Sequence, residues 1–102
     1  MKVPSNATLK KYGLSESQYY LLWLSQGKVC PICKRGEEEV LNWHIDHVHV
    51  RGFKAMKPDE KRKFVRGILC AFCNQRLLTK GWTLEKAQNA VAYLNDYKDR
   101  TR

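Results

Sequence analysis

The sequence predicts a small α+β domain, and three observations support this fold class. The chain has 102 residues, which is enough for one domain with a thin hydrophobic core. Two C-x2-C pairs could hold a metal ion, which would stabilise such a core. Two strand-like segments lie among segments that have the caps and periodicity of helices. We therefore expect a single domain over residues 14–102, preceded by a loosely held basic arm over residues 1–13.

The composition indicates a soluble protein with an anionic partner. The formal net charge of +9 is large for this length, and it favours nucleic acid over a membrane as the partner. The alternative is a basic, soluble protein without such a partner. The longest apolar run, residues 19–24, is far shorter than the roughly 20 residues that cross a bilayer, and no signal peptide is visible. We therefore expect a cytoplasmic protein, in which cysteines stay reduced.

The first predicted helix covers residues 16–26. Ser15 and Gln18 have the spacing of a capping box, and Leu14 can pack on Tyr19 as a hydrophobic staple. Helical spacing puts a set of large side chains on one face, which we expect to cover the core. This set is Tyr19, Leu22, Trp23 and Gln26.

Two strands are predicted in the middle of the chain. Residues 40–50, which follow a tight turn over residues 29–36, alternate between apolar and polar with the period of a half-buried strand. One face carries Leu41, Trp43 and Ile45, and the other carries Asn42, His44 and Asp46. Residues 51–64 form a basic loop in which Pro58 can open a helical turn, and residues 65–69 form the second strand.

The C-terminal part is predicted to be helical. A helix begins at the second cysteine pair and covers residues 70–78, with Leu77 and Leu78 packed inward. Thr83 caps a last helix over residues 84–97. The predicted apolar face of this last helix is Ala87, Ala90, Val91 and Leu94.

The four cysteines predict one structural zinc site. Two residues between the members of a pair allow both sulfurs to reach one ion, and two such pairs complete a tetrahedron. Four thiolates leave no open coordination position, so zinc catalysis is not expected. A redox C-x-x-C motif would need one pair and a thioredoxin-like pattern, which is absent. The predicted ligands are Cys30, Cys33, Cys70 and Cys73.

A histidine–aspartate cluster lies between the cysteine pairs. The three histidines of the chain, His44, His47 and His49, surround Asp46. Hydrolysis of a phosphodiester requires a base, for which neutral imidazole is suited, and a cation that stabilises charge on the phosphate. Asp46 offers a hard oxygen ligand for Mg²⁺, and Asn74, directly after the last cysteine, offers a second. The alternative is that these are ordinary strand and surface residues.

Two strings carry a resemblance to a known family. HIDHVH at residues 44–49 and VRGILCAFCNQRL at residues 65–77 resemble the recombination endonuclease VII family of phages, which belongs to the ββα-metal (HNH, His-Me finger) nucleases. The family pattern is C-x-x-C, then D-H-x-H, then V-R-G-L-L-C-x-x-C-N. The resemblance implies a ββα-metal finger, in which a helix packs across a hairpin. The zinc site would staple this finger, and N- and C-terminal helices would flank it.

The resemblance also implies an activity and residue roles. The chain would be a Mg²⁺-dependent (or other divalent cation-dependent) DNA endonuclease of phage or prophage type, acting in the host cytoplasm. Asp46 and Asn74 would ligate the catalytic cation, and His47 would be the general base. His49 would assist at the scissile phosphate, and Arg66 would hold phosphate or brace the site.

This chain departs from the family pattern in two places. An insert separates the two strings where typical members have a short turn, and it is either a DNA-contact loop or a solvated charge run. Leu77 stands where the junction-resolving phage enzyme carries an acidic residue, which puts junction resolution in doubt. The predicted DNA contacts are Lys54, Lys57, Lys61, Arg62, Lys63 and Arg66.

Other functions remain open at this point. A non-catalytic, zinc-containing DNA-binding module would need only the cysteines and the basic residues, and a structural protein with a zinc staple is a third option. The sequence leaves open the preferred substrate and the choice between a nick and a double-strand break. It also leaves open the oligomeric state: cleavage of both strands would suggest a homodimer, while a monomer could nick.

Overall fold

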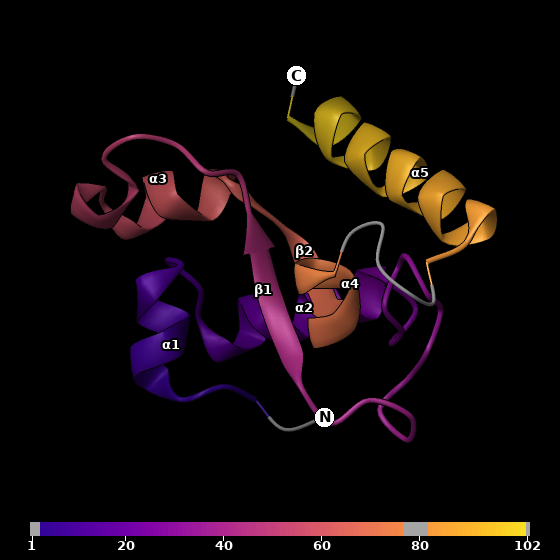
Figure 1. The fold of residues 1–102 in the computed structure, drawn as a ribbon. Coiled ribbons are helices and arrows are strands. Elements are labelled where there is room, and N and C mark those ends of the chain that lie inside the picture. Colours follow the sequence, from indigo (N-terminus) through magenta and orange to yellow (C-terminus); the bar gives the residue numbers. More distant parts are fainter. Residues whose placement is uncertain (1–2, 77–81, 102) are drawn as a thin grey trace.

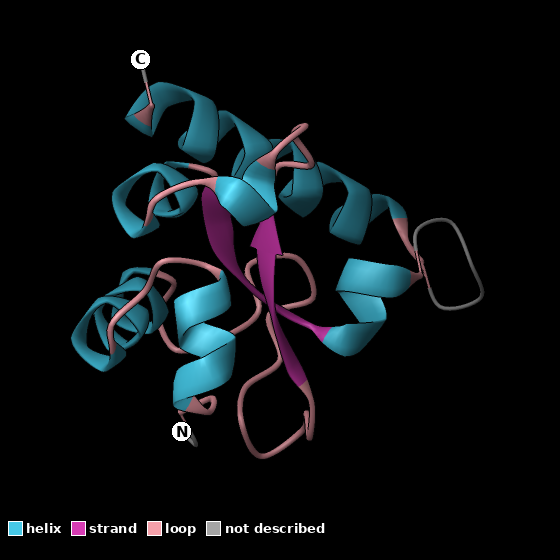
Figure 2. Cartoon of the chain, turned by 90° about the vertical axis from the view of Figure 1, so that its left-hand side faces the viewer, coloured by secondary structure: helices cyan, strands magenta, loops and turns pink. Residues whose placement is uncertain are grey.

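The computed structural model describes residues 3–76 and 82–101 and confirms a small α+β fold. An antiparallel hairpin of β1 (Trp43–His47) and β2 (Val65–Cys70) lies at its centre, with helices on both sides (Figure 1). In the view turned by 90° the two strands cross the middle of the molecule, and the longest helix passes behind them at the top (Figure 2). The helices are α1 (Asn6–Lys11), α2 (Glu16–Ser25), η1 (Phe53–Ala55), α3 (Pro58–Lys63), α4 (Ala71–Gln75) and α5 (Leu84–Arg100). None of the described helices is both long and apolar enough to cross a membrane.

The hairpin is shorter on its first strand than the sequence predicts. Ile45 lies opposite Ile68, and Asp46 lies opposite Gly67, with a register irregularity between Asp46 and His47. The strand does not extend over residues 40–50, and Leu41 is 97% exposed. The alternating pattern therefore assigned side chains to the correct face only within the paired strand. Before this strand the chain is not part of a sheet, so an apolar residue such as Leu41 has no sheet face on which to be buried.

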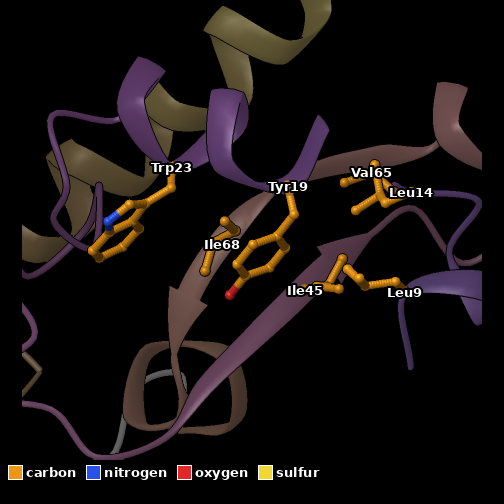
Figure 3. Packing of buried hydrophobic residues seen from close by; sticks show 7 residues of the cluster. All are labelled: Leu9, Leu14, Tyr19, Trp23, Ile45, Val65 and Ile68. Atoms are coloured by element: carbon orange, nitrogen blue, oxygen red, sulfur yellow. The ribbon is translucent and has the colours of Figure 1, made fainter. Parts of the chain in front are cut away.

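One side of the hairpin is covered by α1 and α2. The predicted capping box of α2 is present: Ser15 N donates to Gln18 Oε1 at 2.8 Å, and Gln18 N donates to Ser15 Oγ at 3.1 Å. Tyr19 and Trp23 of this helix are buried against the strands, as their spacing predicts. The cluster on this side, drawn in Figure 3, is Leu9, Leu14, Tyr19, Trp23, Ile45, Val65 and Ile68.

The N-terminal segment differs from the loose basic arm that the sequence suggested. Residues Asn6–Lys11 form α1, whose start is capped by Ser5 Oγ accepting from Thr8 N at 3.3 Å. Leu9 is 3% exposed and belongs to the cluster under α2. A single leucine among lysines is too weak a pattern to show periodicity, yet its burial is enough to hold a short helix against the core.

The other side of the hairpin carries the cysteines. Here α4 begins directly after β2, and Cys70 caps it by accepting from Cys73 N at 3.4 Å. The predicted inward packing of Leu77 and Leu78 lies outside the described residues. The cluster on this side is Cys30, Ile32, Leu69, Cys70, Cys73 and Tyr93.

The last helix, α5, has its predicted cap but not its predicted face. Thr83 Oγ1 accepts from Lys86 N at 3.2 Å, and Ala90 packs against the cysteine-side cluster. The predicted apolar face was wrong for its two larger side chains, because Val91 is 60% exposed and Leu94 is exposed as well, whereas Ala87 is half-buried. The helix is attached instead through hydrogen-bonding side chains on a neighbouring stripe, which are Asn89, Tyr93, Tyr97 and Arg100.

The basic insert is partly helical. Pro58 occupies the first turn of α3, as predicted, and the helix extends to Lys63. The carbonyl of Gly13 accepts from Arg62 Nη1 at 3.4 Å, which joins the insert to the end of α1. Gly13 has a φ of +72°, and a Cβ there would collide with the carbonyl of Pro58. The glycine therefore permits α1 and α3 to approach closely.

Candidate functional site

The four predicted cysteine ligands come together into one cluster. Their Sγ atoms all lie within 4.8 Å of one another, and Cys33 Sγ is 3.7 Å from Cys70 Sγ. Four sulfurs at 2.3 Å from a zinc ion would be separated by about 3.8 Å, so the cluster has nearly the dimensions of a tetrahedral zinc site. Three of the four side chains are buried, as in a closed structural site. The cluster could therefore hold a metal ion such as zinc.

Local backbone structure positions each pair. In the first turn, Lys34 N donates to the carbonyl of Cys30 at 2.8 Å, and Cys30 N donates to the carbonyl of Arg35 at 2.9 Å. Lys34 adopts a left-handed φ of 66°, which closes this turn. The second pair stands where β2 ends and α4 begins. A hairpin strand and a tight turn thus bring together pairs that are far apart in the sequence.

The electrostatics of the cluster reflect its crowding. The hydrogen bond with Cys70 and then burial raise the pKa of Cys30 to about 12, and the same hydrogen bond lowers the pKa of Cys70. Burial, followed by the charge of Cys30, raises the pKa of Cys73 to about 12. Arg35 Nε donates to Cys33 Sγ at 3.3 Å, so a fixed positive charge faces the sulfurs. A cation that binds here must replace protons, and Arg35 offsets the excess negative charge of four thiolates.

Asp46 is the most enclosed polar residue of the predicted active site. It is 7% exposed, and Arg66 holds it with two hydrogen bonds, from Nε to Oδ2 at 2.9 Å and from Nη2 to Oδ1 at 3.1 Å. The hydroxyl of Tyr93 donates to Oδ2 at 2.7 Å. Burial raises the pKa of Tyr93 far above its usual value, so its hydroxyl stays protonated and remains a donor. Arg66 and Tyr93 together fix this carboxylate.

Asn74 lies beside His44. Its Nδ2 atom is 3.0 Å from His44 Nδ1, so the amide donates and the unprotonated ring nitrogen accepts. His44 is two residues before Asp46, and alternate residues of a strand share a face. Helix α4 therefore places Asn74 beside β1, next to the residue that lies two positions before Asp46.

His47 and His49 lie in a separate aromatic group. The ring centroid of His47 is 4.8 Å from that of His49, 4.7 Å from that of Phe53 and 5.2 Å from that of Tyr12. Burial, followed by the charge of His49, lowers the pKa of His47. His47 is therefore held neutral at pH 7, which is the form that can accept a proton.

The predicted DNA-contact residues separate into three groups. Lys54 and Lys61 line a groove beside His47. Two arginines donate to other groups of the protein instead: Arg62 to the carbonyl of Gly13, and Arg66 to Asp46. The third group is Lys57 and Lys63, which are exposed at the two ends of α3.

Two grooves follow β1. One, of about 850 Å³, includes His44 and Asn74 among its lining residues. The other, of about 720 Å³, includes His47 and His49. Tyr12 is among the lining residues of both grooves. We call the two together the β1 trough.

Several residues that organise the site escaped the sequence-based prediction. Tyr93 and Tyr12 lie far from the histidines in sequence, and no spacing rule connects them. Gln26, expected only on a helix face, exchanges two hydrogen bonds with Ile68: its Oε1 accepts from N at 2.7 Å and its Nε2 donates to O at 2.8 Å. Only Arg35 could have been found from the sequence, because a basic residue directly after the first cysteine turn lies close to the sulfurs.

Fold and site together define a small α+β domain with a metal-type cysteine cluster next to a histidine-bearing strand. The family model for recombination endonuclease VII matches residues 5–96, and the chain belongs to this family. The resemblance recognised in the sequence is thereby confirmed.

Curated relatives come from mycobacteriophages. The chain is 33% identical over 89 residues to the Gene 59 protein of Mycobacterium phage D29. This match covers 84% of the chain and 46% of the phage protein. The chain is 32% identical over 89 residues to the Gene 59 protein of Mycobacterium phage L5, with the same coverage. The chain thus spans about half the length of the curated relatives it matches. No solved structure matches it significantly.

Proposed function

We propose that this protein is a divalent metal-dependent DNA endonuclease of the ββα-metal (HNH) type, which hydrolyses phosphodiester bonds in the cytoplasm of a phage host. The observation that carries the proposal is the β1 trough, in which His44 and Asn74 line one groove and His47 lines a second, with Tyr12 in both. Membership of the recombination endonuclease VII family supports a nuclease. The order of hairpin and following helix, β1, β2 and α4, is the order expected of the ββα finger.

A structural zinc at the cysteine cluster would position the catalytic residues. Cys73 is buried in the cluster, and Asn74 is the next residue along α4. A tetrahedral ion that holds Cys73 would therefore also hold the first turn of α4 against β1. Such a structural role needs no open coordination position on the ion.

Asp46 and Asn74 are the proposed ligands of the catalytic cation. Both offer oxygen atoms, which Mg²⁺ prefers, and such an ion would stabilise negative charge on the phosphate. A carboxylate has about four lone-pair sites, and the hydrogen bonds from Arg66 and Tyr93 use three of them. Asp46 is thus held in one orientation while retaining capacity for one more partner. Arg66 braces the carboxylate in this arrangement.

His47 is the proposed general base. Its lowered pKa keeps the ring unprotonated, and the rings of Tyr12 and Phe53 pack against it. It could accept the proton of an attacking water on a phosphodiester lying in the trough. His49 is exposed beside it and could contact the same phosphate.

Plasmid cleavage tests the proposal. The wild-type protein should nick or linearise plasmid DNA with Mg²⁺ or Mn²⁺ and lose this activity when the added cation is withheld. His47→Ala should cut at least about 100-fold more slowly, because general bases contribute at least this much. Its zinc content and circular dichroism should match the wild type. Plasmid that stays intact with every divalent cation tested would contradict the proposal.

A second candidate is a non-catalytic DNA-binding module, favoured by the hydrogen bonds that already occupy Asp46. Asn74→Ala separates the two functions, because the side chain is exposed and its loss should spare the fold. An endonuclease would lose cleavage, whereas a binding module would change at most its DNA affinity. Whether one copy nicks or a homodimer cuts both strands is measured by combining cleavage with light scattering.

A further inference from the structure

The groove beside His47 combines aromatic rings with lysines. It has a volume of about 720 Å³, within the range of pockets that hold a small organic ligand. Its walls come from the end of α1, the segment after β1 and the insert that carries η1 and α3. The lining residues that the argument uses are Lys11, Tyr12, His49, Phe53, Lys54 and Lys61.

The aromatic rings of this groove lie close together. Tyr12 and Phe53 have centroids 6.3 Å apart, and both rings contact His47. A lysine ammonium stands over each ring: Lys11 Nζ is 5.6 Å from the Tyr12 centroid, and Lys61 Nζ is 5.9 Å from the Phe53 centroid. Proteins that bind single-stranded nucleic acid use this combination, since the rings stack on bases and the cations attract phosphates.

The charge of the groove is of one sign. Lys11, Lys54 and Lys61 line it, and among the described residues none of its lining side chains is acidic. The ligand that fits such a surface is flat, apolar on its faces and linked to negative charge. A nucleotide has all three properties.

The groove is a built part of the fold. Arg62 joins α3 to the carbonyl of Gly13 at the end of α1, and the hydroxyl of Tyr97 in α5 donates to the carbonyl of Lys63 at 2.9 Å. The wall formed by α3, which carries Lys61, is therefore held in place by contacts to α1 and α5.

We propose that this groove is a subsite for one unpaired nucleobase, which stacks on the ring of Phe53 while Lys54 and Lys61 hold the adjoining phosphates. Bases inside a duplex are already stacked on their neighbours, so only an unpaired or extruded base can occupy the subsite. The inference rests on the proposed function, since it places the base next to the phosphate presented to His47. It assigns the insert a role in choosing DNA that has an unpaired nucleotide at the cleavage position.

Binding to two labelled strands tests the subsite. One strand is oligothymidylate and the other is an abasic strand of the same length, each measured by fluorescence anisotropy without added divalent cation. Phe53→Leu keeps an apolar side chain but removes the ring, and it should weaken oligothymidylate binding about tenfold while leaving the abasic strand unchanged. Phe53→Tyr should bind like the wild type. Tyr20→Leu, which removes an exposed ring of α2, is the matched control.

Lysine variants test the phosphate contacts. Lys54→Ala should reduce the salt dependence of binding for both strands, by about 0.7 in the logarithmic slope. Lys98→Ala removes the same charge from exposed α5 and should leave the slope unchanged. The subsite is ruled out if Phe53→Leu affects both strands equally or neither, or if the two lysine variants behave alike. Circular dichroism and zinc content verify that each variant is folded.

The subsite and the proposed activity can fail separately. If the wild type prefers the strand with bases, and loses that preference in Phe53→Leu, but never cuts plasmid, the subsite stands without the nuclease. If the wild type cuts plasmid and Phe53→Leu shows no loss specific to bases, the nuclease stands and the subsite is overturned.

Discussion

The two edges of the hairpin are built differently. The β2 edge is closed: Gln26 pairs with both the N–H and the carbonyl of Ile68, and the side chains of Ile68, Leu69 and Cys70 are buried. In the part of the chain that the structure describes, β1 pairs only with β2, and the β1 trough lies beside β1. Its residues His44 and His47 remain half-buried.

This difference separates stability from chemistry within one pair of strands. The buried side chains belong mainly to β2, which ends at Cys70 of the cysteine cluster, while two of the predicted reactive residues, Asp46 and His47, belong to β1. Asp46 is both reactive by prediction and buried, since it is held by Arg66 from β2 and Tyr93 from α5. The predictions below test how independent the two edges are.

The largest effect is expected from breaking the cysteine cluster, which lies where β2 ends and α4 begins. Cys73→Ser should abolish zinc binding and the cooperative unfolding transition, because structural zinc contributes about 10–16 kcal/mol, as much as the whole stability of a small domain. Asn74→Ala, the adjacent change, should shift the free energy of unfolding by less than about 0.5 kcal/mol. Zinc content and urea unfolding measure both variants. A Cys73→Ser protein that keeps its zinc and its melting temperature would refute the role of the cluster.

The next largest effect concerns the contact between the end of α1 and the start of α3. Gly13→Ala should lower the free energy of unfolding by about 3 kcal/mol, since the new methyl group is strained at a positive φ and collides with the Pro58 carbonyl. Gly27→Ala, which has the same φ of +72° but open space around it, should cost only about 1–2 kcal/mol. Equal losses in urea unfolding would show that α1 and α3 yield to the clash.

A smaller loss is expected from opening the β2 edge itself. Gln26→Leu leaves the N–H and the carbonyl of Ile68 without their partner, which should cost about 2 kcal/mol. Gln88→Leu, an exposed position on α5, is the control and should be nearly neutral. Thermal unfolding followed by circular dichroism measures the difference. Unchanged thermal stability of Gln26→Leu would mean that water takes over the hydrogen bonds to Ile68.

The smallest effect should come from the residue that connects the edges. Tyr93→Phe removes only the hydroxyl that donates to Asp46, while Arg66 keeps its two hydrogen bonds, so the expected loss is about 1.5 kcal/mol. Tyr20→Phe, an exposed tyrosine, should change the stability by less than about 0.5 kcal/mol. A loss larger than that for Gln26→Leu would show that Asp46 depends on Tyr93 more than on Arg66.

The sequence predicted features that depend on short-range rules. The cap residues Ser15 and Thr83 mark the starts of α2 and α5, and each accepts the expected backbone hydrogen bond. The cysteine pairs were recognisable because a ligand motif has a fixed spacing, and the structure brings all four together. The paired part of β1 was recognisable from alternation.

Features that depend on long-range contacts were not predictable in the same way. The face of α5 was misassigned because polar side chains, Asn89 and Tyr93 among them, attach it, whereas a hydrophobic pattern marks only apolar contacts. The position of Asn74 next to His44 depends on where α4 starts relative to β1, which no local pattern specifies. The proposed roles of Asp46, His47, His49 and Asn74 remain predictions for the variants above.

The attachment of α5 bears on the order in which this chain folds. Its side chains donate to groups that lie 34 to 57 residues earlier in the chain, and it runs along the outside of the molecule (Figure 1). Contacts that close such long loops form later on average than contacts within helices or the pairing of β1 with β2, whose partners are closer in sequence. Docking of α5 should therefore be the last folding step, and its undocking the easiest local opening. Amide hydrogen exchange should be faster in α5 than in β2, and each opening removes the Tyr93 hydroxyl from Asp46.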